Sequence, residues 1–416
     1  MKYLFLSNPA VGHTNSLISI ALELKRIGED VLFMLPGVNN EFIRKRINRA
    51  EIHIQDNLSD KKINFEIIPI SLIQVYNGLV LEKKTGKEEW LHALKVFSSG
   101  AKRYFNFISH SIERYKPDAI IYDYTFFPAI AISEKFNIPR IAIYPTGLPF
   151  CEYPIPEFGK FQNYNNFTFE EYNQSVSIIK KTEELIKKKY EKIINKNIDI
   201  CFISKPNSKY LNIITSIEEA EYPRKDLDNT VFFVGPCLKG MDAKDEIKKN
   251  KKLLIYISLG TFFNNRPELF EVMINACKNF EADIIVSAGK SYKMVQKKYM
   301  QNNIKIYERV SQINILKKAD IFLTHGGKNS INESLKFGVP MILFPIGGEQ
   351  EYNAKLIEYL KCGKMIVNVD ENKISEAVNE VFNKNFYSEN ARKLSKKMTN
   401  SDGSENAVKI IRKKSP

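Results

Sequence analysis

Short apolar runs alternate along the chain with longer segments in which apolar residues recur every three or four positions. Residues 2–7 form an apolar run, a turn follows at 8–12, and residues 16–27 carry the helical spacing until Gly28 interrupts it. Residues 31–35 form the next apolar run. A strand, a helix and a second strand in this order predict a βαβ unit, and therefore a parallel sheet.

The same alternation continues to the C-terminus in two series. The first series predicts a helix at 127–135 and strands at residues 119–122, 139–144, 199–204 and 231–234. The second predicts strands at 253–258, 284–287, 304–307, 321–324 and 341–344, with helices at 267–278, 313–318, 329–337, 353–359 and 404–412. The segments 72–112 and 158–196 are helical and loop-rich, and inserts of that length often carry function.

The two series predict an α/β protein of two Rossmann-like domains with parallel sheets. We expect one domain at 1–235, a polar linker at 236–250, a second domain at 251–400, and a C-terminal helix at 401–416 that packs back on the first domain. Ligands bind beyond the carboxyl ends of strands in such sheets. We therefore expect the site in a cleft between two facing domains.

Composition and charge indicate which kinds of molecule this protein is expected to bind. The 416 residues are 44% hydrophobic and 26% charged, as in ordinary globular proteins, with a net charge of +14. The lysines are scattered, and their short runs at 187–189 and 248–252 lack the interleaved aromatic residues of a nucleic-acid stacking surface. We expect no nucleic-acid partner, whereas a positive field would help to attract a diphosphate.

Cysteine usage and hydropathy point to the cytoplasm. The five cysteines are far apart and odd in number, which argues against a disulfide framework or a metal site. The N-terminal apolar run is shorter than a signal peptide requires, and no apolar stretch approaches about 18 residues. We expect a cytoplasmic protein without stable membrane insertion, whose state as monomer or dimer the sequence leaves open.

The segment 324–334 follows a predicted strand and opens a predicted helix. Gly326 and Gly327 allow backbone amides to approach a ligand closely, and a helix N-terminus offers unpaired N–H groups to an anion. Asn329 and Glu333 are four positions apart and share a helix face. A carboxylate there suits ribose hydroxyls, so the segment predicts a nucleotide diphosphate site, with a plain strand-to-helix turn as the alternative.

A second polar cluster follows the next predicted strand, which ends at Pro345. Glu349 and Gln350 place an acid and an amide side by side at this strand end. Such a pair can bind the hydroxyls of a sugar. A solvated loop is the alternative interpretation.

These two clusters resemble the C-terminal signature of glycosyltransferase family 1, the UDP-dependent glycosyltransferases. The family pattern, T-H-x-G-x-N-S-x-x-E, then G-V-P-M, then D-Q-x-x-N-A, is similar to residues 324–354, and the whole chain looks most like bacterial macrolide-type glycosyltransferases. The resemblance implies the GT-B fold, with the donor held by the C-terminal domain. It also implies an inverting, metal-independent hexosyltransferase that needs no cofactor besides the sugar nucleotide.

The resemblance assigns a donor site by position. The residues implied to surround the diphosphate are His325, Gly327, Asn329, Ser330 and the loop residues Ser258, Gly260 and Thr261. Glu333 is implied to hold the ribose, and Glu349 with Gln350 the donor sugar.

Two departures from the family pattern leave details of the donor open. Relatives carry Asp where this chain has Glu349, which leaves the identity of the sugar open. Their nucleobase loop reads W-x-P-Q, whereas this chain has Arg309-Val310-Ser311-Gln312. A guanidinium stacks on a base, and Val310 offers its backbone to the base edge. We expect UDP-glucose as donor, with a TDP-sugar as the alternative.

The first domain carries the candidate base. His13 lies in the turn after the first predicted strand, and histidine has the intrinsic pKa for taking a proton from an acceptor hydroxyl. Asp123 follows another strand and would orient the ring, whereas Asp118 precedes that strand. Both residues of the pair match the His/Asp dyad of the family. Helix capping is the alternative role for each. The remaining histidines, His53, His92 and His110, lack a paired acid and are interpreted as structural.

One motif could suggest a metal instead. Asp226 and Asp228 form an Asp-x-Asp triplet, which metal-dependent sugar transferases use to hold a divalent ion. The triplet precedes a predicted strand in a charged loop, so we assign it no metal and expect His325 and a helix N-terminus to meet the leaving diphosphate.

The acceptor is the least specified partner. Aromatic residues in and near the inserts could line an apolar pocket, foremost Tyr76, Trp90, Phe126 and Tyr144, with ordinary packing as the alternative. The resemblance implies a hydrophobic small molecule such as a natural product, and a lipid acceptor stays open. A silent sugar-nucleotide-binding protein is disfavoured by the presence of His13, Asp123 and Glu333. A Rossmann dehydrogenase is disfavoured by the missing G-x-G-x-x-G after Leu6.

Overall fold

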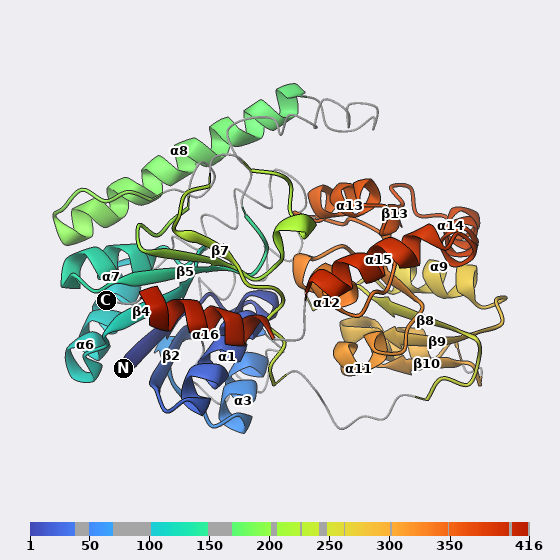
Figure 1. Cartoon of the computed structure of the whole chain (residues 1–416), viewed down its shortest axis with the longest axis horizontal. Helices are drawn as coiled ribbons and strands as arrows, with labels where there is room; N and C mark the ends of the chain where they lie inside the picture. The colour runs from blue at the N-terminus through green and yellow to red at the C-terminus, as the bar shows by residue number, and fades with distance from the viewer. Residues whose placement is uncertain are drawn as a thin grey trace. The chain divides into compact units, whose positions relative to one another are not determined.

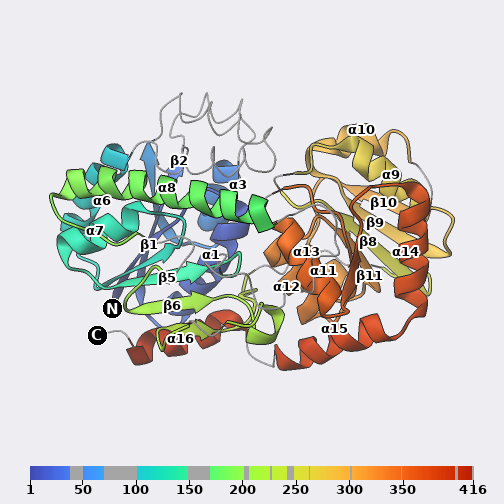
Figure 2. The ribbon, with the colours of Figure 1, turned by 90° about the horizontal axis from the view of Figure 1, so that it is seen from above.

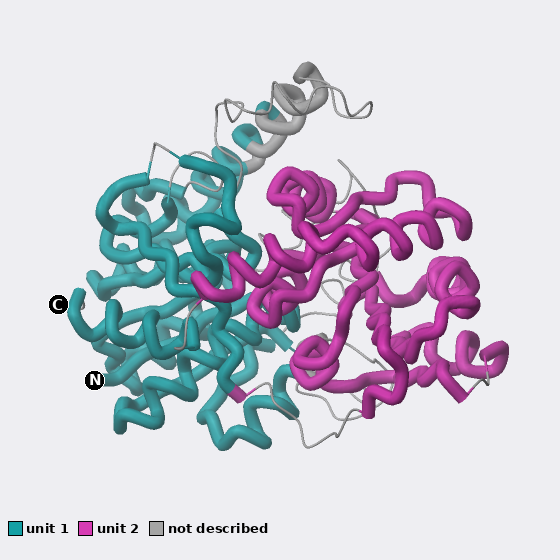
Figure 3. Tube along the Cα trace, turned by 45° about the vertical axis from the view of Figure 1, so that its right-hand side comes forward, with its two compact units in different colours: residues 1–239, 402–416 teal, residues 240–401 magenta. Residues whose placement is uncertain are grey.

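The computed structural model divides into two compact units (Figures 1 and 3). Unit 1 comprises Met1–Lys239 and Asp402–Pro416, and unit 2 comprises Gly240–Ser401. The structure describes residues 1–37, 50–69, 101–148, 169–200, 206–224, 227–240, 248–261, 263–299, 302–347, 349–398 and 402–414. Each unit contains its own parallel sheet.

Within the described residues, unit 1 is built on seven parallel strands in the order β3-β2-β1-β4-β5-β6-β7. The strands are β1 Lys2–Leu6, β2 Asp30–Gly37, β3 Asn64–Pro69, β4 Ala119–Asp123, β5 Arg140–Tyr144, β6 Leu211–Ile214 and β7 Val231–Phe233. The helices are α1 Val11–Arg26, α3 Ala50–Asp60, α6 Ala101–Tyr115, α7 Pro128–Phe136, α8 Phe169–Ile194, η2 Glu218–Ala220 and α16 Gly403–Lys414.

Side chains alternate between the two faces of this sheet, as the pleat requires. Tyr3 and Phe5 of β1 pack in one core with residues of α1, α3 and α16. Leu4 and Leu6 pack in a second core with residues of α6, α7 and α8, and Figure 2 shows α6 and α7 lying side by side. Because helices cover both faces, the strands are continuous apolar runs.

Helix α1 begins at Val11, earlier than the predicted start at residue 16. His13 therefore lies in the first turn of the helix, and the expectation that it occupies the preceding turn is wrong. The hydroxyl of its neighbour Thr14 donates to the Ala10 carbonyl at 3.0 Å within this turn. The helix ends just before Gly28, whose φ of +88° is a left-handed conformation that glycine adopts without strain.

Unit 2 is built on six parallel strands in the order β10-β9-β8-β11-β12-β13. The strands are β8 Leu253–Ser258, β9 Ala282–Ser287, β10 Ile304–Tyr307, β11 Ile321–Thr324, β12 Met341–Leu343 and β13 Gly363–Met365. The helices are α9 Pro267–Cys277, η3 Gly289–Ser291, α10 Tyr292–Gln296, α11 Gln312–Leu316, α12 Lys328–Lys336, α13 Gln350–Tyr359, α14 Glu371–Asn383 and α15 Phe386–Lys397.

The two faces of the second sheet have different neighbours. Ile255 and Ile257 of β8 pack in a core with residues of α9 and α14. Tyr256, between them in sequence, faces the other way and stacks on Phe322 of β11, with ring centroids 4.8 Å apart and planes 14° apart. This stack fixes one aromatic side chain on the face that carries the candidate donor residues.

The C-terminal helix α16 belongs to unit 1 and packs beside α1 (Figure 1). The chain segments that leave and re-enter unit 1 lie against each other, since Gly403 N donates to the Pro236 carbonyl at 2.9 Å. The Leu238 amide also donates to Asp402 at 2.9 Å. Among the helices that the structure describes, none is long and apolar enough to cross a membrane.

Candidate functional site

The candidate base and its carboxylate meet at the carboxyl ends of two adjacent strands. His13 follows β1, Asp123 ends β4, and these strands are neighbours in the centre of the sheet. The chain leaves β1 towards β2 on one side while β4 lies on the other, so this is the topological switch point of unit 1. His13 Nδ1 and Asp123 Oδ2 are 2.5 Å apart.

The two side chains of this pair differ in their exposure to solvent. The Asp123 side chain is fully buried, whereas 21% of the His13 side chain is exposed. Asp118 lies at the other end of β4, where its carboxylate accepts a hydrogen bond from the Lys2 amide at 2.7 Å. Of the two acids that the sequence offers, the structure brings only Asp123 to His13.

Two polar residues that the sequence analysis missed hold the carboxylate. The Thr125 amide and hydroxyl both donate to Asp123 Oδ1, at 2.8 and 2.5 Å. Asn8 Nδ2 in turn donates to the Thr125 hydroxyl at 2.8 Å. All three side chains are buried. Their positions just after β1 and β4, Asn8 before Pro9 and Thr125 two residues beyond Asp123, were the available signal.

The predicted acceptor residues within the described ranges are buried. Phe126 is 1% exposed and stacks near Tyr104 in the core of unit 1. Tyr144 is also 1% exposed, and its hydroxyl donates to Asn212 and accepts from the Asn207 amide. These contacts support packing, and an acceptor role for the two residues stays a prediction without support from their burial. The other predicted acceptor residues, Tyr76 and Trp90, lie outside the described residues.

The candidate donor residues gather at the equivalent point of unit 2. Ser258 ends β8 and His325 follows β11, and these strands are neighbours where the strand order reverses direction. The His325 ring fills the space between two glycines. A Cβ on Gly260 would lie 2.6 Å from His325 Cε1, and one on Gly327 would lie 2.6 Å from Nε2. Only glycine therefore fits at these two positions while the ring stays in place.

Burial sets the charge of this ring. The pKa of His325 is lowered to about 4 because the imidazolium would lose its hydration in the enclosed site. The imidazole is therefore neutral near pH 7 and can donate one hydrogen bond without adding charge. Helix α12 begins beside it at the N-cap Gly327, which has no side chain to cap the first amides. Those amides carry the partial positive charge of the helix.

Glu333 lies one turn into α12 and is 8% exposed. Burial raises the pKa of its carboxyl to about 7, although a hydrogen bond from Gln312 opposes the shift. Gln312 Nε2 donates to Glu333 Oε2 at 2.6 Å and to the Ser330 hydroxyl at 3.2 Å. The structure thus brings together Gln312, Ser330 and Glu333, which are predicted donor residues on α11 and α12.

The predicted sugar-binding pair begins α13. Gln350 is buried, and its side-chain oxygen accepts from the amides of Ile346 and Gly347 at 2.8 and 3.2 Å. Its amide oxygen therefore shapes the loop after β12. Asn353, one turn on, donates to the Gly326 carbonyl at 3.1 Å and ties α13 to the candidate phosphate loop. Glu349, the N-cap residue of α13, is partly exposed.

The loops after β8 and β9 are joined by a residue that the sequence analysis did not single out. Asn264 Nδ2 donates to the Gly260 carbonyl at 2.7 Å, and Ser291 donates to the Asn264 carbonyl at 2.7 Å. Thr261 is exposed in the first of these loops. In the loop before α11, Arg309 is exposed and Val310 partly exposed.

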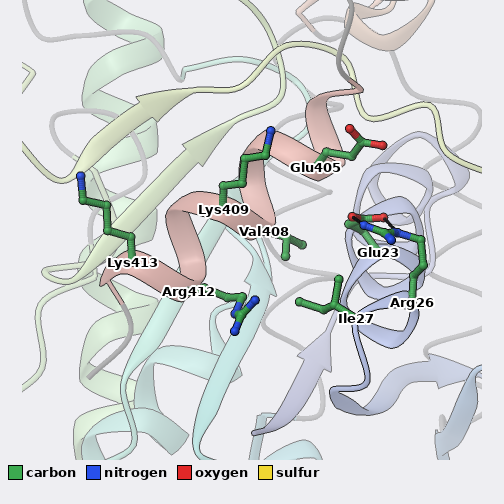
Figure 4. Close-up of a pocket in the computed structure, with 8 residues that line it drawn as sticks. All are labelled: Glu23, Arg26, Ile27, Glu405, Val408, Lys409, Arg412 and Lys413. Carbon is green, nitrogen blue, oxygen red and sulfur yellow. Dashed lines mark hydrogen bonds and ion pairs between the residues drawn. The ribbon is translucent and has the colours of Figure 1, made fainter.

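Other features of the described chain do not form a site. Asp226 lies outside the described residues, and Asp228 accepts hydrogen bonds from Thr230 in a local turn. No group of three or more potential metal-ligating side chains occurs in the described ranges. A pocket of about 490 Å³ lies between α1 and α16 (Figure 4). Its buried acid Glu23 pairs with Arg26 at 2.6 Å and with Lys239, which also pairs with Glu405 of α16 at 3.9 Å.

Comparison with known proteins identifies the family. A family model described as UDP-glucoronosyl and UDP-glucosyl transferase matches residues 162–401. Over 419 residues the chain is 24% identical to an uncharacterized UDP-glucosyltransferase, YojK, of Bacillus subtilis strain 168, across 98% of this chain and 96% of that protein.

Solved structures agree on the fold. The glycotransferase of kitacinnamycin matches 100% of this chain and 99% of its own at 18% identity, with a TM-score of 0.75. The spinosyn rhamnosyltransferase SpnG complexed with thymidine diphosphate matches 99% of this chain and 100% of its own at 12% identity, with a TM-score of 0.73. These likenesses show two Rossmann-like domains of the GT-B type. Because the family match spans more than half of the 416 residues, the chain belongs to the UDP-glucoronosyl and UDP-glucosyl transferase family and is a glycosyltransferase.

Proposed function

We propose that this glycosyltransferase moves glucose from UDP-glucose to a hydroxyl of a hydrophobic small molecule, with inversion at the anomeric carbon and His13 as the base. The contact between His13 and the fully buried Asp123 carries the proposal. When Nδ1–H donates to the carboxylate, the neutral imidazole keeps its lone pair on Nε2. The carboxylate also stabilises the imidazolium that forms when Nε2 takes a proton.

The chemistry balances without a further reactant. The acceptor O–H bond breaks as its proton passes to His13 Nε2, and the oxygen forms a bond to the anomeric carbon from the face opposite the diphosphate. The bond from that carbon to the diphosphate oxygen breaks, and the leaving group keeps the electron pair. In the proposal, the α12 amides and the neutral His325 bind the departing diphosphate. No metal takes part.

The same proposal assigns the remaining donor contacts. Glu333 binds the ribose, Glu349 and Gln350 bind the sugar, and Arg309 and Val310 hold the base. The uncommon Arg309 supports a second candidate donor, a TDP-sugar, and the neighbour SpnG was solved with thymidine diphosphate. Thermal shift with UDP, TDP and NAD separates the donors, and a shift with NAD alone would overturn the transferase assignment of this site.

The acceptor class and the compartment belong to the proposal too. A natural product as acceptor is supported by the whole-chain match to the glycotransferase of kitacinnamycin, and a lipid is the alternative. A cytoplasmic location fits the three free, buried cysteines among the described residues, Cys237, Cys277 and Cys362. A silent sugar-nucleotide-binding protein would bind UDP but transfer no sugar.

The decisive test is His13→Ala. Loss of a general base lowers transfer by about 10²- to 10⁴-fold, while the affinity for UDP is expected to stay unchanged because the proposed donor residues belong to unit 2. His110→Ala is the matched control, since His110 is exposed on α6 and expected to leave both quantities unchanged. Transfer at the wild-type rate in His13→Ala would remove His13 as the base, and a product with retained configuration by NMR would refute inversion.

A further inference from the structure

Three elements of unit 2 are joined by a chain of hydrogen bonds that ends on the candidate ribose carboxylate. The Tyr256 hydroxyl, on β8, donates to Gln312 Oε1 at 3.2 Å. The same amide, at the start of α11, donates through Nε2 to Glu333 on α12 at 2.6 Å. The phenol thus donates to the amide, and the amide donates to the carboxylate.

This order depends on the orientation of the amide. A glutamine side chain offers an acceptor oxygen on one side and a donor nitrogen on the other. If the Gln312 amide turned over, its oxygen would face the oxygen of the ionised Glu333 carboxylate, and neither could donate. The phenolic hydrogen bond to Oε1 adds to the contacts of Nε2 with Glu333 and with the Ser330 hydroxyl, and together they favour the orientation in which Nε2 faces the carboxylate.

Tyr256 itself is closed off from any ligand. It is 1% exposed, and its ring is fixed by the stack on Phe322, its partner in the β8–β11 pairing. The hydroxyl therefore acts from a rigid position beside Ser258 and Ser287, and it reaches Glu333 through Gln312. Gln312 and Glu333 remain the side chains closer to the site, with Glu333 8% exposed.

We propose that Tyr256 is a positioning residue for the nucleotide donor, which holds Glu333 through the Gln312 amide in the orientation that accepts the ribose hydroxyls. The inference rests on the proposed function, in which Glu333 binds the ribose. Removing the phenolic hydroxyl takes away one of the contacts that hold the amide, so its N–H donor to the carboxylate is less well directed. We expect weaker donor binding and weaker discrimination between ribose and 2′-deoxyribose. The rate of the sugar-transfer step is expected to stay unchanged.

The test measures binding of UDP and of 2′-deoxy-UDP at pH 8 by titration calorimetry, with the donor KM and kcat measured alongside. Tyr256→Phe keeps the ring and its stack. We expect UDP binding to weaken about three- to tenfold, the range for one lost buried hydrogen bond. The donor KM rises in parallel, kcat is unchanged, and the preference for UDP over 2′-deoxy-UDP falls towards one.

The matched control is Tyr299→Phe. This variant also loses a phenolic hydrogen bond in unit 2, to Glu271 and Asn275, and is expected to bind UDP as the wild type does. In the background Gln312→Ala, Tyr256→Phe should cause no further loss, because its effect passes through that amide.

Three outcomes would overturn the positioning role: wild-type affinity in Tyr256→Phe, an unchanged preference for UDP over 2′-deoxy-UDP, or losses that add to those of Gln312→Ala. Failure of the proposed function is a separate result, because the wild-type protein would then bind neither UDP nor TDP.

Discussion

The two histidines of the candidate sites have different surroundings at the scale of single residues. His325 is enclosed between Gly260 and Gly327, and burial keeps it neutral near pH 7 by lowering its pKa to about 4. His13 keeps 21% of its side chain exposed beside the buried carboxylate of Asp123. A neutral donor suits a diphosphate-binding role in which the helix supplies the charge, and a ring paired with a carboxylate suits proton transfer.

Glu333 gives a pH dependence that can be measured. Burial raises its pKa to about 7, so the carboxyl is protonated below that pH and ionised above it. The ionised form accepts the ribose hydrogen bonds more strongly, because hydrogen bonds to charged groups exceed neutral ones. We expect the affinity for UDP-glucose to rise about fivefold between about pH 6 and about pH 8, measured by calorimetry.

Using UDP-glucose as the ligand and Glu333→Gln as the control variant makes this measurement specific for Glu333. UDP-glucose lacks the terminal-phosphate proton that titrates at about pH 6 in UDP, and His325 titrates well below the window. Glu333→Gln removes the titrating group and should bind UDP-glucose weakly at every pH tested. The same rise with pH in Glu333→Gln would show that another group is responsible.

At the scale of elements, the loop after β8 and the start of α12 pack against the His325 ring from two sides. Gly327 has an ordinary φ of −64°, so alanine there strains no backbone, but its Cβ would lie 2.6 Å from His325 Nε2. Gly327→Ala should therefore displace the ring and weaken UDP-glucose binding by roughly tenfold or more, with little change in thermal stability. Fluorescence or calorimetric titration measures the loss.

A double variant shows whether the ring is the cause. In His325→Ala the space beside residue 327 is empty, so adding Gly327→Ala should cost no further affinity. If the two losses add instead, the alanine acts on the α12 amides directly and the collision with His325 is not the reason for the glycine.

The sequence predicted many of these elements because buried parallel strands are unbroken apolar runs. Strands β8, β10 and β11 lie at the predicted residues. Strand β6, Leu211–Ile214, was missed, and the strand predicted at 199–204 lies largely outside the described residues. The helix start was wrong for α1 because polar residues in its first turn conceal the apolar spacing.

At the scale of the whole molecule, the last helix returns to unit 1 and completes its core. Ala407, Val408 and Ile411 of α16 are buried in the same core as Leu17 and Ile20 of α1. Ile411→Ala should lower the free energy of unfolding of unit 1 by about 2–5 kcal/mol, the cost of a large-to-small change in a packed core.

Urea unfolding followed by far-UV circular dichroism measures this change. Lys409→Ala, on the exposed side of α16, is the control and should leave the midpoint within error. Equal midpoints for Ile411→Ala and the wild type would mean that α16 adds little to the core of unit 1.

The sequence by itself determined the α/β class, the residues that follow the strands and the family resemblance, because these depend on local periodicity and on short motifs. It could not decide which strand ends become neighbours, since the order of a sheet depends on burial of both faces along the whole unit. His13 and Asp123 are 110 positions apart and meet only because β1 and β4 pair. The chain from Tyr256 to Glu333 and the support of Asp123 by Thr125 likewise exist only in the folded structure.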